Sequence, residues 1–143
     1  MGIPRLNRNG TLPKGVHRAT LAELRAAFGG TSARRVELMM ALETAIERAR
    51  AASVKRILVD GSFVTGKKEP RDIDLVMRVD DKFARLLAGR KKEARWIAER
   101  AKDRHPKMLD LFLAVDEEEW ASWIRLFEQD LWFGAKGVVE VVE

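Results

Sequence analysis

Short apolar runs alternate with stretches of helical periodicity along this chain, and this alternation limits the available folds more than any other feature. The runs at 56–59, 73–79 and 108–115 are rich in Val, Leu and Ile and are bounded by turn-forming residues, which predicts three strands. A shorter run at 138–142 predicts a terminal strand. Strands and helices together in 143 residues indicate one domain of the α/β (α+β) class.

Helix signals fill the stretches between these runs. Thr20 is followed three residues later by Glu23, a capping-box arrangement that predicts a short helix ending near Gly29. The other helices are predicted at 32–52, at 82–104 with an interruption at Gly89, and at 117–129. Four tryptophans lie at or near apolar helical positions, namely Trp96, Trp120, Trp123 and Trp132. We expect them to pack in the core.

The N-terminal segment has a different character. Residues 1–19 carry Pro4 and Pro13 among glycines and show no apolar period, which predicts an extended arm. The folded domain is therefore expected to span residues 20–143.

Composition excludes several classes of protein. The chain has no cysteine, which rules out disulfides, thiolate metal sites and a cysteine nucleophile. It has no run of about 18 apolar residues, so we expect a cytoplasmic protein without a membrane partner. The net charge is +5, with the excess of Lys and Arg in residues 1–56, which permits a polyanionic partner. The basic stretch 82–107 is interpreted as a solvated helix face, with an acceptor nucleic-acid groove as the alternative.

Two aspartates at the head of the second predicted strand are the strongest chemical signal. Asp72 and Asp74 are two residues apart, so their side chains leave the same face of a strand. Like charges this close repel each other in a partly buried place, which usually implies a cation between them. Because oxygen ligands favour Mg²⁺ or Mn²⁺ over Zn²⁺, we expect a magnesium or manganese site.

A third aspartate stands alone in the run 108–115. Asp110 would be costly to bury there without a partner. If the second and third predicted strands are neighbours, Asp110 lies beside Asp72 and Asp74 and completes a three-carboxylate site able to hold two metal ions. These three aspartates are the expected catalytic and metal-binding residues.

A glycine-serine turn precedes the acids. Gly61 permits close approach of the backbone to an anion, and the Ser62 hydroxyl, with the amides of a following helical turn, can bind phosphate. Asp60, directly before this turn, is interpreted as a turn or capping residue rather than as a further ligand. The expected binding site for a nucleoside triphosphate is formed by Gly61, Ser62, Thr65, Lys67, Lys68 and Arg71.

The order of these motifs resembles the signature of the DNA polymerase beta-like nucleotidyltransferase superfamily. That signature has Gly-Ser, then a loop, then Asp-x-Asp entering a strand, and a third carboxylate on a later strand. The resemblance covers residues 54–115 and is closest to the small single-domain bacterial members. Arg71 departs from the serine that is common before the first acid.

The resemblance implies a mixed β-sheet flanked by helices. It also implies a metal-dependent transferase that moves a nucleotidyl group from a nucleoside triphosphate, such as ATP, to a hydroxyl of an RNA, a protein or a small molecule. Mg²⁺ would be held by Asp72 and Asp74, the triphosphate by Gly61 and Ser62, and Asp110 would help to deprotonate the acceptor. A cognate protein partner, in a toxin–antitoxin or defence pair, would fit such a protein.

The same residues fit other interpretations. The same fold can serve as a non-catalytic module that binds nucleotides, nucleic acids or a partner, because a fold alone does not establish function. Glycosyltransferases also use Asp-x-Asp, but this chain is short for that class and has the Gly-Ser turn upstream. Without any chemistry, Asp72 would be a turn residue and Asp74 a solvent-facing strand residue.

Overall fold

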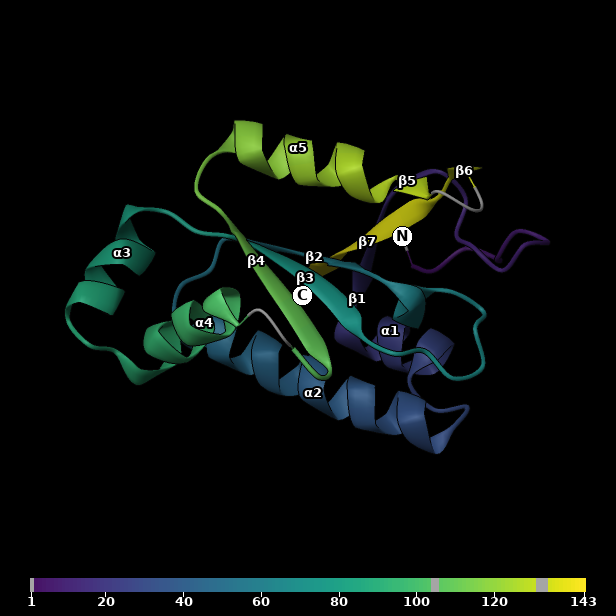
Figure 1. The fold of residues 1–143 in the computed structure, drawn as a ribbon, viewed down its shortest axis with the longest axis horizontal. Coiled ribbons are helices and arrows are strands. Elements are labelled where there is room, and N and C mark those ends of the chain that lie inside the picture. Colours follow the sequence, from purple (N-terminus) through teal and green to yellow (C-terminus); the bar gives the residue numbers. More distant parts are fainter. Residues whose placement is uncertain (1, 104–105, 131–133) are drawn as a thin grey trace.

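The computed structural model describes residues 2–103, 106–130 and 134–143 of the chain. Among these residues, a five-stranded mixed sheet has the order β1-β7-β2-β3-β4 (Figure 1). β1 is parallel to β7 and β3 is parallel to β4, whereas β2 is antiparallel to both of its neighbours. The expected mixed sheet and α/β (α+β) class are confirmed. The strands are β1 Gly15–Thr20, β2 Arg56–Asp60, β3 Ile73–Arg78, β4 Leu109–Ala114 and β7 Gly137–Val142.

Helices cover the two faces of this sheet unequally. α1 Leu21–Phe28, α2 Ala33–Ala51 and α4 Lys92–Lys102 lie on one face, and α5 Glu117–Phe127 lies on the other (Figure 1). α3 Asp81–Ala88 connects β3 to α4. None of the helices in the described part of the chain is long and apolar enough to cross a membrane. The smaller elements are the 3₁₀ turn η1 Ser62–Val64 and a two-stranded sheet of β5 Gln129–Asp130 and β6 Gly134–Ala135.

The strands divide their side chains between two apolar layers. Val59 and Leu75 are register partners and are buried in the layer that faces α1 and α2. Leu58 and Val76, also register partners, are buried in the layer beneath α5 together with Trp120. This alternation follows from the two-residue period of a strand. The expectation for the tryptophans is confirmed for Trp120, which is buried, and for Trp96 and Trp123, which are half-buried and pack against the two layers. Trp132 lies outside the described residues.

Helix boundaries follow the predicted signals closely. The Thr20 hydroxyl accepts a hydrogen bond from the Glu23 amide, and the Glu23 carboxylate accepts one from the Thr20 amide, so the capping box is present. Ser32 caps α2 through the amide of Arg35. The predicted helix at 82–104 is two helices, because the chain turns at Gly89 and the following residue has a positive φ.

The predicted extended arm is wrong for its last residues. Residues 15–20 form β1, an edge strand that pairs in parallel with β7 over its whole length. The close packing depends on Gly137, since a Cβ there would lie 2.1 Å from the Pro13 carbonyl oxygen and 2.8 Å from His17 Nε2. The pairing partner is more than a hundred residues away in the sequence, so no local pattern indicates it. The folded domain therefore includes residues that precede position 20.

Candidate functional site

The acidic residues gather at one end of the sheet. Asp60 is the last residue of β2 and is the register partner of Asp74, near the start of β3. Asp74 is in turn the register partner of Asp110, near the start of β4. Register partners on adjacent strands point to the same face, and neighbouring strands lie about 4.8 Å apart. The fold therefore brings together three carboxylates from three strands.

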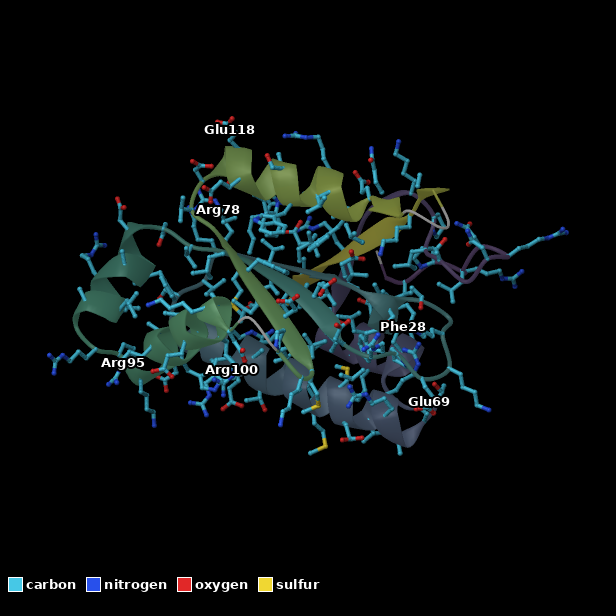
Figure 2. All side chains as sticks on the ribbon, in the orientation of Figure 1. Phe28, Glu69, Arg78, Arg95, Arg100 and Glu118 are labelled. Atoms are coloured by element: carbon cyan, nitrogen blue, oxygen red, sulfur yellow. The ribbon has the colours of Figure 1, made fainter. Side chains whose placement is uncertain are left out.

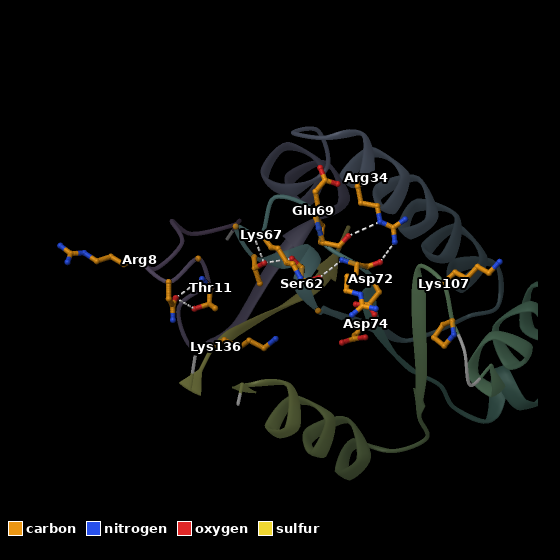
Figure 3. A pocket seen from close by; sticks show the side chains of 18 residues that line it. Arg8, Thr11, Arg34, Ser62, Lys67, Glu69, Asp72, Asp74, Lys107 and Lys136 are labelled. Carbon is orange, nitrogen blue, oxygen red and sulfur yellow. Dashed lines mark hydrogen bonds between the residues drawn. The ribbon is translucent and has the colours of Figure 1, made fainter. Parts of the chain in front are cut away.

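The first aspartate of the motif belongs to the same cluster. Asp72 directly precedes β3, and its charge raises the pKa of both Asp74 and Asp110. The prediction that the second and third predicted strands are neighbours is confirmed, because β3 pairs directly with β4. Asp72 and Asp74 lie between the Ser62 turn and the start of β4 (Figure 3).

Crowding of like charges changes the acidity of the cluster. Burial, and then the charges of Asp72, Asp60 and Asp110, raise the pKa of Asp74 from 3.8 to about 7. The positive charge of Lys136 opposes this shift. Burial is also the main cause of the raised pKa of Asp110, followed by the nearby charge of Asp72. An oxygen-rich cluster with these shifts is suited to a cation that would offset its negative charge.

Asp60 is not the turn or capping residue that the sequence suggested. It is a buried strand residue whose Oδ1 lies 3.1 Å from Nζ of Lys136. The Asp60 side chain is 3% exposed and the Lys136 side chain 12% exposed, so this is an ion pair largely removed from water. Lys136 comes from the segment just before β7 and extends toward Asp74 (Figure 3). Sequence reasoning missed Lys136, because only the sheet order brings the start of β7 to the end of β2.

The glycine-serine turn packs directly against the acids. Gly61 has a φ of +91°, and a Cβ on it would lie 3.1 Å from the Asp74 amide nitrogen and 3.3 Å from the Asp72 carbonyl oxygen. A larger residue would therefore strain the backbone and displace β3. The Ser62 hydroxyl oxygen accepts a hydrogen bond from the Arg71 amide at 3.2 Å, which ties the turn to the residue before Asp72.

A cleft of about 1140 Å³ opens over this end of the sheet (Figure 3). Of the expected residues, Lys68 and Asp110 do not line it. Lys68 is exposed to solvent, and Asp110 lies near the start of β4, beside Asp74. The Thr65 hydroxyl donates to the Ser62 carbonyl oxygen at 2.6 Å, so it also holds the turn together. The expected residues that do line the cleft are Gly61, Ser62, Thr65, Lys67, Arg71, Asp72 and Asp74.

Residues outside the predicted motif complete the walls. Gly10 and its neighbours in the N-terminal segment form one wall, where the Gly10 carbonyl oxygen accepts a hydrogen bond from the Gly66 amide at 2.8 Å. Arg34 and Lys107 line the opposite side. The walls therefore carry more cations than the motif alone supplies. The sequence signals no role for these residues, because they come from segments distant in the chain.

The chemistry of the donor atoms suits a divalent cation, but their present arrangement does not. All candidate ligands are carboxylate oxygens, which suit Mg²⁺ or Mn²⁺. Within the described residues, however, no group of three or more His, Cys, Asp or Glu side chains is arranged so that it could hold a metal ion. The carboxylates share one place in the fold without converging on one point. A cation would have to draw them together by side-chain rotation.

Comparison with known proteins identifies a family but no activity. A family model described as a family of unknown function, DUF6932, matches residues 4–142. No curated protein and no solved structure matches the chain.

Proposed function

The chain belongs to the DUF6932 family, a family of unknown function, and from its site we propose that it is a metal-dependent nucleotidyltransferase. It transfers a nucleotidyl group from a nucleoside triphosphate to a hydroxyl of an acceptor. One observation carries the proposal: Asp72 and Asp74 lie against a glycine-serine turn in a cleft whose walls are rich in cations, and Asp110 lies beside Asp74 on the adjacent strand.

The acids supply the reason for a metal. Asp72 and Asp74 are the ligands proposed for Mg²⁺ or Mn²⁺, with Asp110 as the third carboxylate. The raised pKa of Asp74, which is caused by burial and by its acidic neighbours, indicates that the cluster lacks positive charge. Bound there, a divalent cation would offset this charge and act as a Lewis acid on phosphate oxygens.

The turn supplies the phosphate site. Gly61 lets the backbone approach a phosphate closely, because it has no side chain in the way. The Ser62 oxygen accepts from the Arg71 amide, which leaves the hydroxyl proton to be donated to a phosphate oxygen. Lys67 and Arg71 are exposed cations on the same wall and add favourable charge. Lys68 is the weakest member of the predicted set, since it does not line the cleft.

Asp110 is the proposed proton acceptor. The acceptor oxygen forms a bond to the α-phosphorus, the bond from that phosphorus to the leaving diphosphate breaks, and the hydroxyl proton passes to the Asp110 carboxylate. Burial raises the pKa of Asp110, and a raised pKa makes a carboxylate a stronger base. Its place beside Asp74 sets the acceptor on the β4 side of the site.

The acceptor and the setting belong to the same proposal. The acceptor is an RNA, a protein or a small molecule, and the cationic walls suit an acceptor that carries negative charge. The proposed cytoplasmic location rests on the lack of a long apolar run in the sequence. A cognate protein partner in a toxin–antitoxin or defence pair rests on the resemblance in residues 54–115.

A binding module without catalysis is the second candidate. It is favoured by one observation, that no metal-holding group of side chains is arranged among the described residues. Such a module would keep the cleft and its cations and would bind a nucleotide or an anionic partner without turnover.

Labelled transfer separates the two candidates. The purified chain is incubated with Mn²⁺ and each of four nucleoside triphosphates, labelled at the α-phosphate, in the presence of the RNA, the protein or the small-molecule fraction of a cell lysate. The transferase should deposit label on one fraction, and the Asp74→Asn variant should deposit none. Binding of triphosphate by the wild type without any transfer would instead identify the binding module. No binding and no transfer would contradict both.

A further inference from the structure

Arg35 is a buried cation in the first turn of α2. The residue is 3% exposed. Its guanidinium lies 5.6 Å from the centre of the Phe63 ring and 5.9 Å from the centre of the Phe28 ring, which is marked in Figure 2. Burial lowers its pKa, and the charge of Glu69 opposes that shift. The guanidinium donates hydrogen bonds to backbone carbonyl oxygens of Phe28 at 3.1 Å, Phe63 at 2.7 Å, Thr65 at 2.7 Å and Lys67 at 2.5 Å.

Arg34, the preceding residue, grips the other end of the same loop. Its Nε donates to the Pro70 carbonyl oxygen at 3.2 Å, and its Nη2 donates to the Arg71 carbonyl oxygen (Figure 3). The two arginines, hereafter the arginine clamp, thus bind five carbonyl oxygens of the segment 63–71.

The segment that the arginine clamp holds is the one that builds the candidate site. The loop begins at the turn formed by Gly61 and Ser62 and ends at Asp72. Beyond η1 it has no regular secondary structure before β3, and residues 66–69 are exposed. A loop of this kind loses conformational entropy when it is ordered, so its order requires contacts from elsewhere in the fold. Arginine is suited to this task, because its planar fork offers five donors in fixed directions.

We propose that Arg34 and Arg35 are positioning residues that hold the glycine-serine turn and Asp72 in one arrangement before any ligand binds. The ligand named in this inference rests on the proposed function, whereas the ordering of the loop does not. Arg35 does not line the cleft. Any effect of Arg35 on a bound nucleotide must therefore pass through the loop.

The experiment compares Arg34→Lys and Arg35→Lys with Arg48→Lys. All three variants keep the positive charge, and Arg48 lies on the same helix with its guanidinium 5.6 Å from the Trp96 ring, away from the cleft. Hydrogen exchange followed by mass spectrometry reports the order of residues 63–71, and calorimetry reports the affinity for Mn²⁺–ATP. Circular dichroism and the melting midpoint establish that each variant is folded.

If the arginine clamp orders the loop, hydrogen exchange and Mn²⁺–ATP affinity should change together. In the Arg34 and Arg35 variants, exchange at residues 63–71 should become about tenfold faster and Mn²⁺–ATP affinity about tenfold weaker, as expected for the loss of hydrogen bonds to a charged group. Exchange in the strands should not change, and Arg48→Lys should match the wild type. If Arg35→Lys does not fold, hydrogen exchange in Arg34→Lys alone decides, because Arg34 lines the cleft and could change the affinity directly.

Contrary outcomes are equally specific. Exchange at residues 63–71 that stays at the wild-type rate in the folded variants overturns the inference. Faster exchange with unchanged Mn²⁺–ATP affinity in Arg35→Lys also overturns it, because the loop order would then not serve the site. If the wild type binds no Mn²⁺–ATP, the proposed function fails, and the exchange comparison alone decides whether the arginine clamp orders the loop.

Discussion

Asp74 and Asp110 are register partners on the parallel strands β3 and β4. Asp60 occupies the same register position on β2, on the other side of Asp74. A row of carboxylates across three strands is unfavourable without positive charge, and Lys136 supplies only part of that charge. The electrostatic repulsion in this row therefore destabilises the metal-free protein.

Removing the charge of Asp74 should stabilise the metal-free protein, and more so at higher pH. The pKa of Asp74 is raised from 3.8 to about 7, so the folded state holds a proton that the unfolded state has released between these values. Wild-type stability therefore falls as pH rises through this window, relative to Asp74→Asn, which cannot ionise. We expect the variant to gain about 2–4 kcal/mol at pH 8 and little at pH 4. Urea unfolding at both pH values measures the difference.

Mg²⁺ provides the control for this prediction. If the cation binds at the acids, it should stabilise the wild type at pH 8. The difference in the free energy of unfolding between the wild type and Asp74→Asn should then become smaller. If Asp74→Asn is stabilised relative to the wild type by the same amount at pH 4 and pH 8, the substitution acts through packing and not through charge.

Triphosphate affinity should depend more on the size of the residue at position 61 than on the hydroxyl group at position 62. Ser62→Ala removes one hydrogen bond to a charged phosphate, so triphosphate affinity should fall by roughly 1.5–3 kcal/mol. Gly61→Val should weaken binding further, because Gly61 has a positive φ and a Cβ there contacts the Asp74 amide. Calorimetric titration provides the test, and triphosphate affinity that is unchanged in Gly61→Val would exclude this turn as the phosphate site.

The buried ion pair between Asp60 and Lys136 should show strong coupling. Lys136→Met removes the ammonium group that lies 3.1 Å from the buried Asp60 carboxylate, which should cost about 3–5 kcal/mol. Asp60→Asn in the same chain should restore most of that loss, since the charge to be compensated is gone. A double-mutant cycle in urea measures the coupling. Additive effects of the two substitutions would mean that the pair contributes nothing of its own.

Asp110 should affect turnover more than binding. If it accepts the proton of the acceptor, Asp110→Asn should lower kcat strongly while triphosphate affinity stays near that of the wild type. Asp81→Asn is a suitable control, because Asp81 is an exposed aspartate in the first turn of α3 that does not line the cleft. A loss of triphosphate affinity equal to the loss of kcat in Asp110→Asn would contradict this role.

Much of the site could be predicted because its signals are local. Asp72 and Asp74 stand at the head of an apolar run, and the capping residues mark the helices on either side. The adjacency of Asp110 required one further assumption, that the second and third predicted strands are neighbours. The register confirms that assumption.

What could not be predicted depends on long-range pairing. The sequence predicts an extended arm where β1 lies, because its partner β7 is more than a hundred residues away in the chain. Asp60 and Lys136 meet only through the order of the sheet. Arg35 did leave a signal, since it shares the buried stripe of α2 with Leu38 and Leu42. A charged residue on an apolar stripe indicates a buried polar contact, but the pattern cannot say with what.

Anomalous scattering from Mn²⁺ tests the central claim most directly. Crystals grown with Mn²⁺ and a non-hydrolysable triphosphate would locate the metal by its anomalous signal. We predict a peak between the carboxylates of Asp72 and Asp74, with triphosphate oxygens on its other side and the turn at Gly61 against the phosphates. A well-ordered triphosphate with no manganese peak at these aspartates would contradict it.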